Sequence, residues 1–170
     1  MGLIIKDKIT MLKKGYPTVS DKYDVAGAVL DGSTPVQFGD PVVFSSTKGY
    51  FSAVPSSGLT SINQLAGITV ATNVKVAQDW PATTVQINPG EAFNLLVKGF
   101  IAIELDSAAT EASVTANSQV AMILATGKFT TSDKIAEGTI VTVPNAVFTG
   151  VVENHGTTVA PKLYAEIYIK

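Results

Sequence analysis

The sequence predicts an all-β fold, a compact β-barrel or β-sandwich of about ten short strands with one short helical turn and an N-terminal arm. Short runs rich in Val, Ile and Thr alternate apolar and polar residues, as half-buried strands require. Clusters of Gly, Pro, Asn and Asp separate these runs at the close spacing that is typical of sandwiches and barrels. At 170 residues, 46% hydrophobic and 15% charged, the chain is long enough to bury a sizeable core.

The first 24 residues differ from the rest and are expected to form an N-terminal arm (1–24) that precedes the β domain (25–170). The arm carries five lysines against three aspartates, for a net charge of +2, whereas the remainder carries −4. The Gly15-Tyr16-Pro17 sequence breaks any continuous element. Its isoleucines and tyrosines make the arm too apolar for a merely solvated terminus, so we expect it to dock against its own domain or a neighbour.

The first half of the domain is expected to hold short strands joined by turns. Their expected ranges are 25–30, 42–44, 50–54, 67–71, 74–76 and 85–87. Ser61 followed three residues later by Gln64 predicts a capping box and a helical turn, with Gly67 in the left-handed position just past its end. Trp80-Pro81 is expected to form a corner.

The clearest local pattern lies between Pro89 and Asp106. Pro89-Gly90 suits the centre of a type II turn. Two alternating apolar runs, 93–97 and 101–105, flank Lys98-Gly99 and predict a β-hairpin. Matching their apolar faces requires a three-residue loop or a bulge at Gly99.

The C-terminal half predicts further strands over 119–124, 139–143, 146–153 and 163–169, and an extended or turn segment over 129–134. Pro144-Asn145 and Asn154-His155-Gly156 are expected to be turns. The terminal strand is expected to pair with an earlier strand and seal a barrel.

The sequence predicts no catalytic, cofactor or metal site. Cysteine is absent and His155 is the single histidine, which excludes thiolate and multi-histidine zinc sites. No Gly-X-Ser-X-Gly, Walker or dinucleotide motif is present. Glu104 and Asp106 could form a carboxylate pair for acid–base work or calcium binding, although such a pair is more often a solvated strand face.

Composition also argues against nucleic-acid and membrane partners. All twelve basic residues are lysine, so the guanidinium fork that favours phosphate and base recognition is missing. The net charge of −2 gives no general attraction to nucleic acid or anionic lipid. No run approaches the ~20 apolar residues that a spanning helix needs. Tyr164 and Tyr168 share a polar strand face and could form a sugar-binding platform, or pack across strands or against another subunit.

Several motifs together resemble the capsid cement (decoration) proteins of tailed bacteriophages, over most of the chain from Val25 on. They are Gly39-Asp40-Pro41-Val42-Val43, Gly67-Ile68, Pro89-Gly90-Glu91, Ala146-Val147-Phe148 and Leu163-Tyr164-Ala165-Glu166-Ile167. The resemblance implies a structural virion protein without enzymatic activity or cofactor. It would bind the outside of an assembled capsid and bridge major capsid subunits, after synthesis in the host bacterial cytoplasm.

The resemblance also implies self-association matched to the capsid lattice, for which we expect a trimer. The arm and its junction supply the candidate capsid or subunit contacts: Ile4, Ile5, Ile9, Met11, Leu12, Lys13, Lys14, Tyr16 and Tyr23. One alternative is a carbohydrate- or receptor-binding module of a head or tail fibre, using Tyr164, Tyr168 or Trp80. Another is a small enzyme with the Glu104 and Asp106 carboxylates.

Overall fold

The computed structural model describes residues 12–18, 23–71, 85–157 and 160–170 and confirms the all-β prediction. Its strands are β1 (Tyr23–Asp31), β2 (Val36–Gln37), β3 (Pro41–Phe44), β4 (Phe51–Ala53), β5 (Leu65–Val70), β6 (Gln86–Ile87), β7 (Ala92–Glu104), β8 (Gln119–Ile123), β9 (Lys128–Thr131), β10 (Ile140–Asn154) and β11 (Leu163–Ile169). The short 3-10 turns are η1 (Ile62–Gln64), η2 (Glu111–Ser113) and η3 (Ser132–Lys134). The expected strand at 74–76 and the Trp80-Pro81 corner lie outside the described residues.

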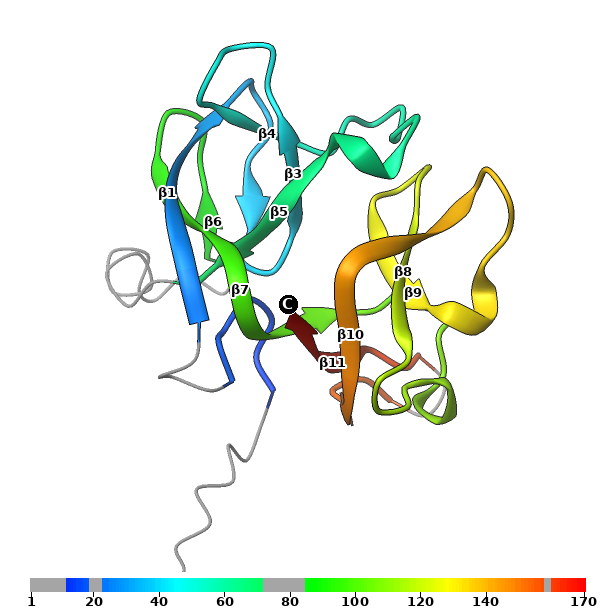
Figure 1. The fold of residues 1–170 in the computed structure, drawn as a ribbon. Helices are drawn as coiled ribbons and strands as arrows, with labels where there is room; N and C mark the ends of the chain where they lie inside the picture. The colour runs from blue at the N-terminus through cyan, green and yellow to red at the C-terminus, as the bar shows by residue number, and fades with distance from the viewer. Residues whose placement is uncertain (1–11, 19–22, 72–84, 158–159) are drawn as a thin grey trace, which may run out of the picture.

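Two small barrels lie side by side and share one strand (Figure 1). In the first barrel, β1, β4, β3, β5 and β7 pair in that order, and β7 pairs back with β1 to close the ring. In the second barrel, β7, β11, β10, β8 and β9 pair in order. A parallel bridge between Leu105, just after β7, and Phe129 of β9 closes the second ring. Closure leaves few strand edges open to other chains.

The predicted hairpin at Lys98-Gly99 is wrong, because β7 continues through it as one strand. Gly99 has partners on both edges, Tyr23 on β1 and Ile169 on β11, which a hairpin tip cannot have. Gly99 bends the strand with a φ of +126°. The bulge expected in this region lies at Val97, which is the extra residue in the pairing with β1.

The predicted Pro144-Asn145 turn is also wrong, because both residues lie inside the continuous strand β10. Asn145 adopts a φ of +60°. The register of β10 against β8 shifts between Thr142 and Val147, so these residues kink the strand without reversing it.

The predicted capping box is confirmed at η1. The Ser61 hydroxyl accepts a hydrogen bond from the Asn63 amide at 3.2 Å, and the Gln64 side chain accepts from the Ser61 amide at 3.2 Å. The placement of Gly67 in a left-handed cap is wrong, because Gly67 lies within β5 opposite Val42. A Cβ there would lie 2.8 Å from Leu95, so glycine permits a close side-chain contact across the strands.

The two barrels bury hydrophobic cores of different size. The smaller core fills the first barrel and consists of Ala28, Leu30, Val36, Phe38, Val42, Ile87, Phe93 and Leu95. The β2–β6 ribbon contributes Val36 and Ile87 to it. The larger core fills the second barrel around Ile101, Ile103, Phe129, Phe148 and Ile167, and also takes Val43, Ile68, Val70 and Leu96 from strands of the first barrel. The barrels are therefore packed against each other and form one body.

The 12–18 segment, which is the described part of the arm, docks against its own domain. The Gly15 amide donates to the Ala102 carbonyl of β7 at 2.8 Å, and the Gly15 carbonyl accepts from the Ala71 amide at 2.8 Å. Pro17 forms an isolated bridge with Ile101. The segment thus ties the end of β5 to the shared strand β7.

No helix in the described part of the chain is long and apolar enough to cross a membrane.

Candidate functional site

An exposed aromatic tip stands at the end of the β3–β4 hairpin. Phe44 is 63% exposed and Tyr50 is 41% exposed, and the 44–50 turn between them carries Lys48. The Phe44 ring lies 5.8 Å from the Phe51 ring, which packs edge-on against Phe93 of the first core at 6.2 Å. We call Phe44, Tyr50 and Phe51 the aromatic tip. The core holds the Phe51 ring from beneath and Phe51 lies beside Phe44, so the tip presents apolar surface on a packed base.

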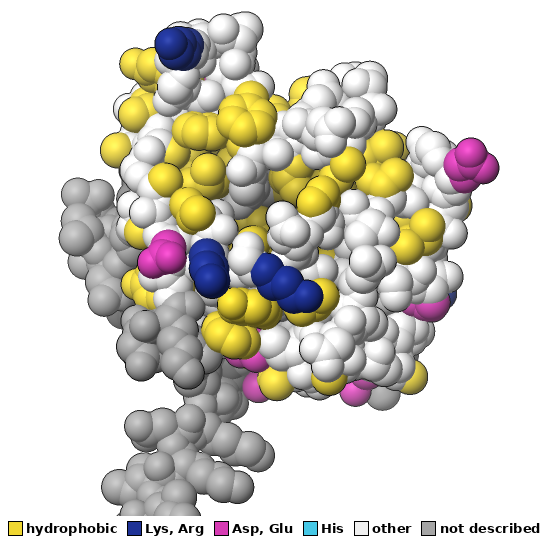
Figure 2. Space-filling view, viewed as in Figure 1, with side chains coloured by type: hydrophobic (Ala, Val, Ile, Leu, Met, Phe, Trp, Pro, Cys, Tyr) yellow, Lys and Arg dark blue, Asp and Glu magenta, His cyan; other side chains and the backbone are white. Residues whose placement is uncertain are grey.

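The surface around the aromatic tip holds few charges. Figure 2 shows hydrophobic side chains gathered over the first barrel, whereas the visible face of the second barrel is mostly polar and uncharged. Five of the seven large hydrophobic residues that the described chain exposes lie on the first barrel: Tyr23, Val25, Phe44, Tyr50 and Val97. An apolar surface with few charges is typical of a protein–protein contact.

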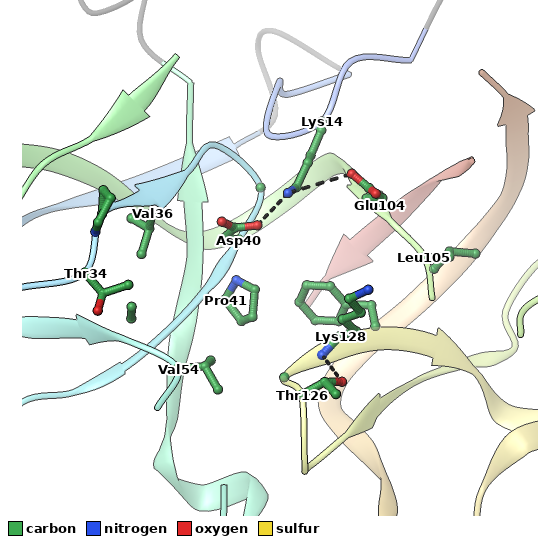
Figure 3. Close-up of a pocket in the computed structure, with 15 residues that line it drawn as sticks. Lys14, Thr34, Val36, Asp40, Pro41, Val54, Glu104, Leu105, Thr126 and Lys128 are labelled. Carbon is green, nitrogen blue, oxygen red and sulfur yellow. Dashed lines mark hydrogen bonds and ion pairs between the residues drawn. The ribbon is translucent and has the colours of Figure 1, made fainter. Parts of the chain in front are cut away.

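A second cluster of functional groups surrounds Lys14, in a hollow between the two barrels (Figure 3). Lys14 Nζ lies 2.5 Å from Asp40 Oδ1 and 3.9 Å from Glu104 Oε2. Lys162 Nζ lies 3.5 Å from the same Glu104 oxygen. The hollow has a volume of about 310 Å³, and its two acids, Asp40 and Glu104, both face Lys14. These pairs fix the 12–18 segment where the barrels meet.

Glu153 fixes the start of the same segment. Its Oε2 accepts a hydrogen bond from the Leu12 amide at 2.6 Å and lies 3.0 Å from His155 Nε2. The His155 ring packs 4.5 Å from the Tyr164 ring. A hydrogen bond with Tyr164 and the nearby charge of Glu104 raise the pKa of Lys162.

The candidate contacts predicted in the arm fall into three groups. Ile4, Ile5, Ile9 and Met11 lie outside the described residues. Leu12 is 3% exposed and Lys14 is ion-paired, so both are engaged within the fold. Lys13 is exposed with its amine 5.9 Å from the Tyr16 ring centroid, Tyr16 is half-buried, and Tyr23 opens β1 with 38% exposure.

The described residues of the alternative hypotheses are held in local contacts, and Trp80 lies outside the described residues. The Asp106 carboxylate accepts a hydrogen bond from the Ala108 amide at 3.0 Å, while Glu104 is shared by two lysines. Tyr168 stacks on Phe100 with ring centroids 4.6 Å apart, and Tyr164 packs on His155. Among the described residues, no group of three or more His, Cys, Asp or Glu side chains could hold a metal ion.

Comparison with known proteins identifies the family. Residues 10–166 match a family that is described as structural cement protein and includes E217 gp24 and Pam3 gp6. The chain belongs to this family. It is therefore a structural virion protein of the phage capsid-stabilising class, as the motifs in the sequence indicated.

The fold is similar to that of a chain in a solved structure described as the capsid of Myoviridae phage XM1. That match has a TM-score of 0.60 and 15% sequence identity, and covers 97% of this chain and 96% of the other. At this identity the likeness shows the fold. No curated protein matches the sequence.

The aromatic tip was not predicted from the sequence, although a signal for it is present there. Phe44-Ser-Ser-Thr-Lys-Gly-Tyr50-Phe51 places aromatic residues on both sides of a turn that contains Gly49. Aromatic residues that flank a turn are often read as core strand residues. The ends of such a hairpin lie beyond the barrel wall, where only part of each ring is covered.

Proposed function

We propose that this cement protein binds the outer surface of an assembled phage capsid, bridges neighbouring major capsid subunits and thereby stabilises the shell against internal pressure. The observation that carries the proposal is the aromatic tip, a rigid apolar surface with few charges in a member of the cement family. Burial of Phe44 and Tyr50 against a capsid subunit would remove apolar area from water, which favours binding.

Bridging requires at least two contact regions on one rigid body. The aromatic tip supplies one. The 12–18 segment and the residues around it supply the other, because Glu153 and Asp40 hold this segment in place through Leu12 and Lys14. Ile4, Ile5, Ile9, Met11 and the exposed Lys13 and Tyr23 remain our proposed contacts there. Two linked contacts raise the affinity beyond that of either one through their effective concentration.

The proposal includes self-association on the capsid exterior, with no nucleic-acid or membrane partner and no catalytic activity. From the resemblance to capsid cement proteins we expect this self-association to give a trimer. Synthesis is expected in the host bacterial cytoplasm, followed by addition to assembled shells.

Co-sedimentation with undecorated shells of the parent phage tests the proposal. We expect the purified protein to pellet with the shells and to raise their heat resistance. Phe44→Ser should weaken shell binding at least tenfold while leaving the thermal midpoint of the free protein nearly unchanged, because the Phe44 side chain is mostly outside the core.

The matched control is Ile135→Ser, which changes a large hydrophobic residue of the second barrel with 47% exposure. We expect Ile135→Ser to bind shells like the unmodified protein. Equal losses for both variants would contradict the assignment of the aromatic tip. Absence of co-sedimentation by the unmodified protein would contradict capsid binding itself.

A further inference from the structure

An apolar groove lies at the junction of the two barrels, where β7 passes from the first into the second (Figure 1). β5 and β11 pair with the same edge of β7, one after the other: β5 lies opposite residues 94–96 and β11 lies opposite residues 99–104. Neither of these fully described strands pairs with Val97 or Lys98. Val97 bulges and β10 kinks at Pro144-Asn145 beside this gap, so the strands do not close over it.

The lining of the groove is apolar. The groove has a volume of about 440 Å³, within the range of about 300–1,000 Å³ that is usual for binding clefts. Of the described residues that line it, none is charged and Asn63 alone carries a polar side chain. Ile68 and Leu96 lie buried in it, whereas Val97 is 53% exposed. Among the large hydrophobic residues that the structure describes, only Phe44 is more exposed than Val97, so the groove offers apolar surface that the fold leaves uncovered.

Two lysines stand at one end of the groove. Val97 and Ile169 line the groove, and Lys98 and Lys170 are the residues that follow them in the chain. Because Gly99 pairs with Ile169 in an antiparallel register, Lys98 and Lys170 are neighbours across the two strands. Both lysines are exposed, and neither has an ion-pair partner among the described residues. A lysine amine sits on a flexible four-carbon stem, so both charges can reach a group that is bound in the groove.

The acids near this end do not cancel its positive charge. Asp24 of β1 lies opposite Lys98 in the strand register, but no ion pair joins these two described residues. Glu166 lies four residues from Lys170 along β11, which is about 13 Å in a strand. Two amines against the Asp24 carboxylate leave one excess positive charge beside an uncharged groove. A partner that is complementary to this surface therefore has apolar side chains next to a carboxylate.

We propose that this groove binds an apolar segment of a capsid subunit that carries an acidic residue next to its apolar side chains. The apolar side chains cover Ile68 and Leu96, and the carboxylate lies between Lys98 and Lys170. Burial of Val97 and of the groove floor removes apolar area from water, and the two lysines favour one orientation of the bound segment. The inference rests on the capsid binding proposed above and adds a contact at the barrel junction, separate from the aromatic tip.

A photo-cross-linker at Val97 identifies what occupies the groove. The chain contains no cysteine, so Val97→Cys supplies a single thiol for a benzophenone label. The labelled protein is bound to undecorated shells of the parent phage, irradiated and digested, and mass spectrometry identifies the joined peptides. We expect one peptide of a capsid subunit, with apolar residues next to an aspartate or glutamate. The control is Val151→Cys, at a valine of the second barrel with 45% exposure, which should give at least tenfold fewer of these cross-links.

Three results of this experiment would overturn the inference. The first is cross-linking of Val97→Cys only to residues of this chain, its own arm included. The second is a yield no higher than that of Val151→Cys. The third is a capsid peptide that has no acidic residue beside the cross-linked position.

Shell binding by substituted proteins tests the two parts of the groove separately. Val97→Asp should weaken binding at least tenfold, because it places a charge where the partner is apolar. Lys170→Glu should weaken binding at least threefold at low salt and less at high salt, since salt screens exposed charges. Both side chains are exposed, so the thermal midpoints of the free variants should stay close to that of the unmodified protein. Val151→Asp and Lys128→Glu, at exposed positions of the second barrel, are the matched controls and should bind like the unmodified protein.

The outcomes separate this inference from the proposed function. If Val97→Asp and Lys170→Glu bind shells as tightly as their controls while Phe44→Ser binds weakly, the groove is not a contact and the proposed capsid binding stands. If the unmodified protein does not bind shells at all, both are refuted.

Discussion

The two barrels share one strand and each is a ring of five strands, yet they differ in how many hydrophobic residues they bury and expose. The second barrel gathers twenty buried hydrophobic residues in its core, including four from strands of the first barrel, whereas the core of the first barrel holds eight. The first barrel exposes five large hydrophobic residues and the second exposes Ile135 and Val151. The described residues of the first barrel include six charged side chains, against eleven in the second.

This difference indicates a division of labour within one body. The second barrel buries its apolar residues and covers its surface with charged and polar groups, as a structural unit in water does. The first barrel leaves apolar residues at the aromatic tip and along the edge of β1, where they can be buried against other proteins. Both barrels contain β7. The larger core of the second barrel therefore stabilises the first barrel, on which a partner would bind.

The largest expected effect on the free energy of unfolding comes from truncating a buried phenylalanine in either core. Phe129→Ala in the second barrel should lower the free energy of unfolding by about 3–5 kcal/mol, because Phe129 is fully enclosed and leaves a cavity. Phe93→Ala in the first barrel should cost about 3 kcal/mol or less, since the half-buried Phe51 ring beside it can move into the space. Urea unfolding of both variants measures the two values.

A larger loss for Phe93→Ala than for Phe129→Ala would break the comparison, because the smaller core would then be the more important for stability. A variant that unfolds in two separate steps would show that the shared strand fails to couple the barrels.

The second effect concerns Gly15, where the 12–18 segment connects the two barrels. Gly15 has a φ of +79°, and a Cβ there would lie 2.5 Å from the carbonyl carbon of Phe38. Gly15→Ala must therefore displace backbone as well as adopt a strained conformation. Gly32→Ala is the matched control, because Gly32 has a φ of +90° and open space around it. Gly32→Ala should cost about 1–2 kcal/mol, the cost of the left-handed conformation alone.

Thermal and urea unfolding should show a clearly larger loss for Gly15→Ala than for Gly32→Ala. Similar losses would mean that the contact between Gly15 and the 38–39 backbone relaxes freely. In that case the segment would not couple the barrels.

The sequence was sufficient for the fold class and for most strands, because alternation and turn residues are local signals. Leu163, Ala165 and Ile167 of β11 are buried in the predicted alternation, and Gly90 takes the positive φ of the predicted turn. The aromatic tip escaped prediction because local pattern does not tell a covered ring from one that extends past the barrel wall.

The two wrong reversals have one physical cause. Lys98-Gly99 and Pro144-Asn145 are turn formers, and Gly99 and Asn145 do adopt positive φ angles. A single residue of that kind can reverse a chain or kink it. The chain continues as one bent strand where other strands pair with both of its edges. Gly99 is paired with β1 and β11, and β10 is paired with β8 and β11. Those partners come from elsewhere in the chain, so the local pattern could not decide between a hairpin and a long bent strand shared by two barrels.

The smallest expected effect is an acid dependence that each barrel carries at one aspartate, half-buried Asp31 in the first and exposed Asp133 in the second. A hydrogen bond from the Ser45 hydroxyl to Asp31, at 2.5 Å, lowers the pKa of this carboxyl in the first barrel. The neighbouring Thr131 side chain, with further help from Lys134 and Ser113, lowers the pKa of Asp133 in the second. A depressed pKa adds stability above the unfolded value of 3.8, and this stability is lost as the pH falls through the folded pKa.

Asp31→Asn and Asp133→Asn should therefore each lower the thermal midpoint slightly at neutral pH, because solvent reaches both carboxylates and screens them. Each difference from the unmodified protein should stay constant down to about pH 4 and close below it. Calorimetry over this range should show one transition for both variants, since β7 makes the barrels unfold together. A difference that widens below pH 4 would reverse the sign argued here, and a separate transition for Asp31→Asn alone would show that the first barrel melts independently of the second.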